Sequence, residues 1–190
     1  MERNEALQII KKHLPEKRYI HTLGVLDTAL QLARKYGSDL GQTELAAIFH
    51  DYAKYRPHEE MRRVIVESSL PKQLLDFHPE LWHAPVGAIL VQRELGIDDE
   101  GILNAIKYHT TGRPGMTVLE KVIFLADYIE PNRSFPGVEQ VRELAERNLD
   151  LAVFQALQNT IIHLVENRVS VYPDTVHTYN DFVKRIFVSQ

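Results

Sequence analysis

Hydrophobic residues recur along almost the whole chain with the spacing of an α-helix, whereas the sustained alternation of a β-strand is nearly absent. On a helical wheel of the second such segment, one face collects Tyr19, Leu23, Leu26, Leu30 and Ala33. The pattern predicts helices over residues 4–13, 16–36, 42–55, 58–68, 84–95, 99–110, 117–130, 138–147, 150–167 and 176–187. The predicted fold class is therefore all-α.

Turn-forming residues separate these segments and support the predicted boundaries. Gly37 follows the second segment, Pro57 and Pro71 stand in connections, and the sequence TTGRPGM forms a loop at residues 110–116. No linker, low-complexity tract or internal repeat divides the chain. A chain of 190 residues, 44% of them hydrophobic, can bury one sizeable core, so we expect a single domain over residues 1–190.

Composition and charge exclude several classes of function. A formal net charge of −4 and a pI near 6.1 argue against a nucleic-acid partner, which usually meets a basic face. The chain has no cysteine, which excludes disulfides, thiolate metal sites and cysteine nucleophiles. No apolar stretch is long enough to span a membrane and the N-terminus is charged and amphipathic, so we expect a cytoplasmic protein without a membrane partner. The oligomeric state stays open, with a homodimer as one option.

Polar residues break the apolar pattern at a few positions, most clearly in the stretch AAIFHDYAKY at residues 46–55. There His50 and Asp51 stand side by side in an otherwise apolar segment, about 100° apart on a helix of about 3.6 residues per turn. An unpaired buried carboxylate costs several kcal/mol, roughly, so a partner must hold Asp51 in its charged form.

Four further residues interrupt apolar faces in other segments. His21 lies at the border of its helix's apolar arc, His83 stands just before Pro85, and His109 continues an apolar stripe. Asp127 takes the place of a core residue, because it follows two leucine or isoleucine positions at helical spacing in VLEKVIFLAD.

Each of these residues also has a simpler interpretation. A lone histidine on a half-buried face is more often a hydrogen-bonded core residue than a ligand, and Asp127 alone can pair with a buried arginine. Four histidines and two aspartates that a bundle can bring together are instead the ligand set of iron, manganese, zinc or a similar ion. The remaining histidines are interpreted as structural or solvated: His13, His58, His78, His163 and His177.

The order His21, His50-Asp51, Asp127 resembles the H…HD…D signature of the HD-domain metal-dependent phosphohydrolases. His83 and His109 resemble the longer pattern of HD proteins that hold two metal ions. The stretches HDYAKY, YHTTGRPGM and FLADYIEPNR are similar to the YqeK-type family, described as bacterial symmetrical diadenosine tetraphosphatases. The likeness runs over residues 15–185 and implies an HD-domain helical bundle, with a metal-binding core at about 16–133 and C-terminal helices 138–187 packed on it.

The resemblance also implies a division of the ligands between two divalent ions. One ion is held by His21, His50, Asp51 and Asp127, and the second by His83 and His109, with Asp51 bridging. Two ions about 4 Å apart can activate a water for attack on phosphorus, so no protein nucleophile is needed and Asp51 is catalytic through the metals. Iron is the expected ion, with manganese, cobalt or another divalent ion as alternatives.

Candidate phosphate contacts lie next to these ligands. Lys54 follows Asp51 by one helical turn, and its ammonium is either a solvated lysine head or, as the family pattern favours, a catalytic phosphate contact. Thr110, Thr111 and Gly112 follow His109 directly, and Gly112 and Gly115 allow backbone N–H groups to approach phosphate. Arg133 is placed to clamp a phosphate. Arg18 and Arg113 are weaker candidates for phosphate contact and are expected to be surface charges.

The leading hypothesis is hydrolysis of a nucleotide phosphoanhydride, with diadenosine tetraphosphate as the expected substrate and two molecules of ADP as products. One alternative is another HD-type nucleotide phosphohydrolase. A different class is a metal- and nucleotide-binding sensor with little turnover, and a purely structural helical protein is weaker still. Nucleotide or phosphate release with added divalent metal separates the enzymes from both binding hypotheses.

Overall fold

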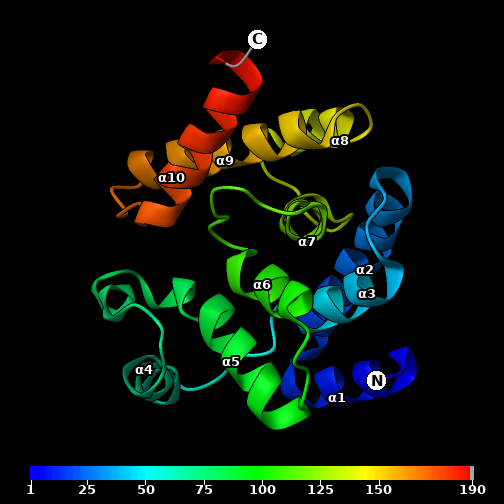
Figure 1. Ribbon diagram of the computed structural model, residues 1–190, viewed down its shortest axis with the longest axis vertical. Helices are drawn as coiled ribbons and strands as arrows, with labels where there is room; N and C mark the ends of the chain where they lie inside the picture. Colours follow the sequence, from blue (N-terminus) through cyan, green and yellow to red (C-terminus); the bar gives the residue numbers. More distant parts are fainter. Residues whose placement is uncertain (189–190) are drawn as a thin grey trace.

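The structure is a computed structural model that describes residues 1–188, and every regular element in this range is helical (Figure 1). The α-helices are α1 (Arg3–His13), α2 (Glu16–Tyr36), α3 (Leu40–Phe49), α4 (His58–Glu67), α5 (His83–Leu95), α6 (Glu100–Tyr108), α7 (Val118–Ile129), α8 (Val138–Ala145), α9 (Leu149–Glu166) and α10 (Pro173–Val183). Short 3₁₀ helices cover Lys72–Asp76 and Pro79–Leu81, and a π-helical turn covers Lys184–Val188. The all-α prediction is confirmed.

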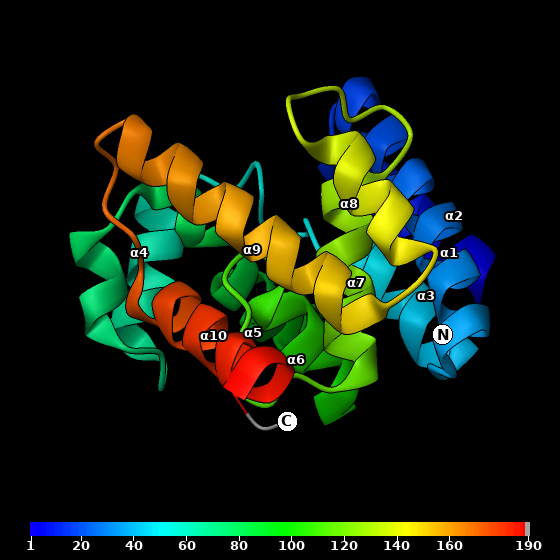
Figure 2. The ribbon, with the colours of Figure 1, turned by 90° about the horizontal axis from the view of Figure 1, so that it is seen from above.

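The helices pack around a central group formed by α2, α3, α6 and α7. Helix α2 packs on α3 and α7, and α6 packs on α3, α5 and α7. Figure 1 shows α8, α9 and α10 gathered at one end of the molecule. In Figure 2, α9 crosses over α7 with α10 beside it, in agreement with the contacts of α9 to both helices. Fully buried side chains such as Phe49, Ile48, Ile106 and Ile123 form the core between the central helices.

Local signals in the sequence explain where several helices begin and end. Asp39 and Asp99 cap α3 and α6 by accepting from backbone N–H groups in the first turn, and Thr117 and Glu120 form a capping box on α7. Gly37 closes α2 in the left-handed conformation, with φ 76°. No helix within residues 1–188 is long and apolar enough to cross a membrane.

Several predicted helices end earlier than the hydrophobic pattern indicated, and two of them end directly before a predicted ligand histidine. The predicted helix 42–55 ends at Phe49, and the predicted helix 99–110 ends at Tyr108. The same contact occurs just after both ends, where the ring Nδ1 atoms of His50 and His109 bond to the carbonyl oxygens of Ala47 and Ile106. Beyond Phe49 the backbone continues in tight turns, with bonds such as Lys54 N–H to the Asp51 carbonyl.

Candidate metal centre

Five elements that lie far apart in the sequence bring the six predicted ligands together. His21 comes from α2, His83 opens α5, and Asp127 lies in the last turns of α7. His50 and Asp51 directly follow α3, and His109 directly follows α6. The four histidines and Asp51 are buried, whereas Asp127 is half-buried. The sequence pattern had suggested that His50 and Asp51 lie on a helical face. In the structure both residues instead lie just beyond the end of a helix.

The four imidazole rings all turn the same nitrogen toward the centre. The Nδ1 atoms of His50, His83 and His109 lie 2.7, 2.5 and 2.8 Å from the carbonyl oxygens of Ala47, Glu80 and Ile106. The Nδ1 atom of His21 lies 3.0 Å from Oε1 of Glu130. Because these oxygens can only accept, each neutral ring carries its proton on Nδ1 and leaves a bare lone pair on Nε2.

These bare nitrogens face one another and face carboxylate oxygens. The Nε2 atoms of His83 and His109 are 3.2 Å apart. Nε2 of His21 is 3.0 Å from Oδ1 of Asp127, and Nε2 of His50 is 3.0 Å from Oδ2 of Asp51. Lone pairs and negative charge at these separations repel each other unless a cation lies between them. The arrangement is therefore that of a cation site.

Asp51 presents one oxygen to each half of the cluster. Its Oδ2 atom lies on the side of His50 and His21, and its Oδ1 atom lies 3.2 Å from Nε2 of His83 and 4.0 Å from Nε2 of His109. Donor atoms of His21, His50 and Asp127 lie within 4.8 Å of one another, as do those of His50, Asp51 and His109.

A divalent metal ion fits this donor set. Three buried atoms that could bind a metal have no hydrogen-bond partner: Nε2 of His21, Nε2 of His50 and Oδ1 of Asp51. An oxygen or nitrogen of another predicted ligand lies close to each of them. Buried polar atoms normally have a hydrogen-bond partner, so three unpartnered atoms at one place need an explanation. Imidazole nitrogen together with carboxylate oxygen is the ligand chemistry of iron, manganese, zinc and similar ions.

The electrostatic environment keeps the carboxylates charged. Burial alone would raise the pKa of Asp51, but His50 and His83 outweigh it and hold that pKa well below its usual range. Burial is likewise outweighed at Asp127, whose pKa is held well below its usual range by His21, His50 and Arg133. Deprotonated carboxylates are the form in which these groups bind metal.

The pKa values of two predicted ligand histidines are shifted in opposite directions. Burial and the neighbouring rings of His50 and His83 lower the pKa of His109 to about 3, which keeps this ring neutral. At His50 burial also lowers the pKa, but Asp51 and Asp127 outweigh it and raise the pKa overall. A metal ion and a proton thus compete for Nε2 of His50, which makes metal binding dependent on pH.

Glu130 is a buried partner of His21 that the sequence interpretation missed. Its side chain is buried, Oε1 lies against Nδ1 of His21, and Oε2 accepts from the backbone and side-chain N–H groups of Asn132. Such a carboxylate orients a ligating imidazole and increases its basicity. Gly24 leaves room for it, since a Cβ atom at position 24 would lie 2.6 Å from Oε2 of Glu130. The sequence did offer one signal for this role, which is a glutamate three residues after Asp127 at the end of an apolar helix.

Glu130→Gln should lower metal affinity by roughly 10- to 100-fold, the usual effect of losing such a partner. Glutamine has one acceptor oxygen, so either His21 or Asn132 loses its partner. Glu120→Gln is the matched control, because Glu120 has the same 1% exposure but bonds to Arg113 and Thr117 instead. Metal titration against a competing chelator measures both variants. An equal change in the two affinities would contradict the role of Glu130.

Two arginines contact the ligand carboxylates. Arg18 forms an ion pair with Oδ2 of Asp51, and only 18% of its side chain is exposed, so its interpretation as a surface charge was wrong. Nη2 of Arg133 lies 2.7 Å from Oδ1 of Asp127, and its Nε donates to the carbonyl of the same residue. Arg113 instead pairs with Glu120, 2.9 Å away. Arg18 was missed because the sequence gives no sign that α2 carries it toward Asp51.

The other predicted phosphate contacts have mixed surroundings. Nζ of Lys54 lies 2.6 Å from Oε2 of Glu80, in a turn and not on the expected helix. The Thr110 hydroxyl is buried without a hydrogen-bond partner, and the Thr111 hydroxyl donates to the Gly112 carbonyl. The N–H groups of Gly112 and Gly115 already donate to the Tyr108 carbonyl and to Asp181. These two N–H groups are thus engaged within the protein.

Comparison with known proteins places the site in a family. Residues 18–132 match the HD domain family, a range that includes all six predicted ligands. The chain is 59% identical over 180 residues to the symmetrical bis(5'-nucleosyl)-tetraphosphatase of Bacillus subtilis, covering 95% of this chain and 97% of the relative. It is 54% identical over 183 residues to the protein of the same name from Halalkalibacterium halodurans, covering 96% of this chain and 98% of that relative.

A solved structure shares the fold and the HD superfamily. The crystal structure of a predicted HD superfamily hydrolase involved in NAD metabolism, from Clostridium acetobutylicum, superimposes with a TM-score of 0.92 at 37% identity. The alignment covers 97% of this chain and 98% of that structure. With this fold, this His/Asp cluster and relatives of this similarity, the chain belongs to the HD domain family, in the group of the symmetrical bis(5'-nucleosyl)-tetraphosphatases.

Proposed function

We propose that the protein is a metal-dependent phosphohydrolase that cleaves diadenosine tetraphosphate symmetrically. The observation that carries the proposal is the convergence of four bare imidazole nitrogens and two charged carboxylates on one buried volume. The names of the relatives at 59% and 54% identity supply the substrate class. One water is consumed, its oxygen ends on the terminal phosphate of one ADP, and the second ADP leaves with the bridging oxygen.

Two metal ions account best for the arrangement of the donors. His21, His50 and Asp127 would hold one ion, His83 and His109 would hold the second, and Asp51 would serve both. The two oxygens of Asp51 face these two groups, which supports the assignment. We propose iron as the ion, with manganese and cobalt as alternatives, because all three accept nitrogen and oxygen ligands.

Divalent ions bound there lower the pKa of a water and neutralise charge on phosphoryl oxygens. The chain's own residues prepare the site for this chemistry. Glu130 and the three backbone carbonyls fix the ring orientations of the histidines, so the donor atoms need little rearrangement. Burial of Asp51 and the histidines keeps bulk water out, which strengthens every electrostatic interaction in the site.

Two alternative functions are compatible with the same site. Another HD-type nucleotide phosphohydrolase and a metal- and nucleotide-binding sensor with little turnover would use the same ligands. Product analysis with diadenosine tetraphosphate, run on metal-loaded protein and on protein stripped of metal, distinguishes all three. Metal-dependent release of ADP supports the proposed function, whereas turnover of a different nucleotide alone, or binding without turnover, supports one of the others.

Lys54, Arg133 and Thr110 are the proposed phosphate contacts on this chain. Lys54 is bound to the exposed side chain of Glu80, an interaction that lowers the pKa of Glu80. A phosphate can replace this partner because a surface ion pair contributes little. The Thr110 hydroxyl is a buried donor in need of an acceptor. Thr111 and Gly112 shape the same loop, and their own polar atoms are already bonded within it.

Lys54→Ala should lower kcat/KM for diadenosine tetraphosphate by roughly 10- to 100-fold, the range expected for one charged hydrogen bond. Metal content should stay at the wild-type level because Lys54 contacts none of the six ligands through its side chain. The matched control is Lys35→Ala, which removes an equivalent 2.6 Å pair with Glu146 far from the site. Steady-state kinetics and metal analysis on both variants provide the measurement. Unchanged kinetics would show that Lys54 is a solvated lysine that does not contact the substrate.

A further inference from the structure

Two separate cavities adjoin the metal centre. The first, here called the arginine cavity, has a volume of about 580 Å³ and is lined by residues that include Lys17, Arg18, His21, Tyr55, Arg133 and Phe135. The second, here called the lysine cavity, has a volume of about 270 Å³ and is lined by residues that include Lys54, His78, His83, Thr110 and Tyr172. They have no lining residue in common.

The cavities meet the metal centre from different sides. His21 lines the arginine cavity and its Nε2 atom is near Oδ2 of Asp51. His83 lines the lysine cavity and its Nε2 atom is near Oδ1 of Asp51. Asp51, with one oxygen toward each histidine, therefore lies between the two cavities.

The arginine cavity has the chemistry of a nucleotide site. Three cations, Lys17, Arg18 and Arg133, line it in a chain whose formal net charge is −4. Its one acidic lining residue, Glu130, is already bonded to His21 and Asn132. Guanidinium groups are suited to bidentate contact with phosphate. Arg18 and Arg133 pair with the carboxylates of Asp51 and Asp127, so the cavity places cationic groups directly beside the metal centre. Metal ions bound by those carboxylates would leave the guanidinium groups available to phosphate.

The same cavity also offers aromatic surface. Tyr55 is 56% exposed and Phe135 is 37% exposed, both unusually open for aromatic residues. Phe135 is held at its edge by Tyr128, with ring centroids 5.0 Å apart. Exposed aromatic rings beside cationic groups are the usual platform for stacking of a nucleobase. Charge for the phosphates and aromatic surface for the base therefore occur together.

We propose that the substrate straddles the metal centre, with one nucleoside diphosphate half in each cavity and with Tyr55 and Phe135 contacting the base in the arginine cavity. This inference rests on the proposed function, since only a substrate with a nucleoside at both ends needs two such sites. It assigns Arg18 and Arg133 to the phosphates of one half and Lys54 to those of the other. A scissile bond over the metal centre then lies in the middle of the phosphate bridge.

The test uses a double variant, Tyr55→Ala with Phe135→Ala, in the metal-loaded protein. Equilibrium dialysis with ADP should give two molecules bound per chain in the wild type and one in the double variant. This readout does not depend on turnover. One ADP per chain in the wild type, or two in the double variant with unchanged affinity, would overturn the proposal.

A comparison of two substrates gives an independent measurement. Adenosine 5'-tetraphosphate has the same number of phosphates as diadenosine tetraphosphate but only one nucleoside, which the lysine cavity can still hold. The double variant should lower kcat/KM for diadenosine tetraphosphate by about 10- to 100-fold, as expected for loss of base stacking. The loss for adenosine 5'-tetraphosphate should be smaller, because its single adenosine can bind in the lysine cavity instead. An equal loss on both substrates, or no loss on either, would overturn the proposal.

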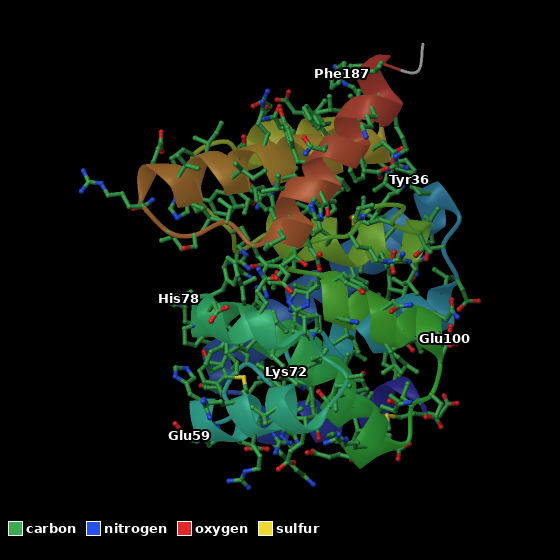
Figure 3. All side chains as sticks on the ribbon, turned by 60° about the vertical axis from the view of Figure 1, so that its left-hand side comes forward. Tyr36, Glu59, Lys72, His78, Glu100 and Phe187 are labelled. Carbon is green, nitrogen blue, oxygen red and sulfur yellow. The ribbon has the colours of Figure 1, made fainter. Side chains whose placement is uncertain are left out.

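The control is Phe187→Ala. Phe187 is 58% exposed, close to the value for Tyr55, but contacts Phe154 and lines neither cavity. Figure 3 shows it at the C-terminal end of the molecule, well away from His78 of the lysine cavity. It should retain two bound ADP molecules and wild-type kinetics. If wild-type protein with metal fails to hydrolyse diadenosine tetraphosphate, the proposed function fails, whereas the ADP stoichiometry still reports on the two cavities.

Discussion

Asp51→Asn should lower hydrolysis of diadenosine tetraphosphate by about 1,000-fold or more and remove most of the bound metal. Its carboxylate faces both halves of the histidine cluster, so one substitution weakens both proposed ion positions. The amide keeps the volume of the side chain but removes the charge and replaces one acceptor oxygen by an NH₂ group. Loss of metal activation is worth several kcal/mol, roughly, which corresponds to the stated factor.

The chain should still fold with asparagine at position 51. Burial of the Asp51 carboxylate is itself unfavourable, and asparagine removes that cost while it also removes the partner of Arg18. Asp150→Asn is the control, since it removes a carboxylate that pairs with Lys121 and contacts no predicted ligand. Metal analysis, circular dichroism and kinetics on both variants provide the comparison. Full metal content together with full activity in Asp51→Asn would refute the ligand assignment.

The sequence predicted the helices well wherever local signals determined them. The predicted starts at residues 99 and 117 fall on the N-cap residues Asp99 and Thr117, which act within one turn of the residues they cap. The helix ends at Phe49 and Tyr108 were harder to predict, because the apolar pattern continues past both ends, where the side chains of His50 and His109 bond to backbone carbonyls. A contact of this kind is not visible in hydrophobic periodicity. The short 3₁₀ helices at Lys72–Asp76 and Pro79–Leu81 are too brief to show a period.

The candidate ligands could be predicted because polar residues interrupt apolar faces. Contacts between residues far apart in the sequence were harder to predict. The six candidate ligands each break a local pattern, and the structure brings them together. Arg18 lies 33 residues from Asp51 and Glu130 lies 109 residues from His21. On α2 and at the end of α7, both look like ordinary charged residues at helix ends. Only the packing of α2 on α3 and α7 gives them their contacts.

ADP should be the only nucleotide product of diadenosine tetraphosphate hydrolysis when iron, manganese or cobalt is supplied. The position of the cleaved bond depends on how many phosphates lie on each side of the metal centre. Cationic groups on both sides, Arg18 and Arg133 on one and Lys54 on the other, favour two phosphates on each. Because each product equals half of the substrate, ADP should also be a competitive inhibitor.

Chromatography and mass spectrometry of the products, with the reaction run in ¹⁸O-labelled water, measure this register. Hydrolysis in the middle of the bridge should place one labelled oxygen on the terminal phosphate of one of the two ADP molecules and give no AMP or ATP. Equal amounts of ATP and AMP would refute the two-plus-two arrangement while leaving metal-dependent hydrolysis intact. Rapid hydrolysis of a simple nucleotide, with no turnover of diadenosine tetraphosphate, would instead favour another HD-type phosphohydrolase. The positions of the phosphates relative to Asp51 thus decide between two enzymes that share the same metal ligands.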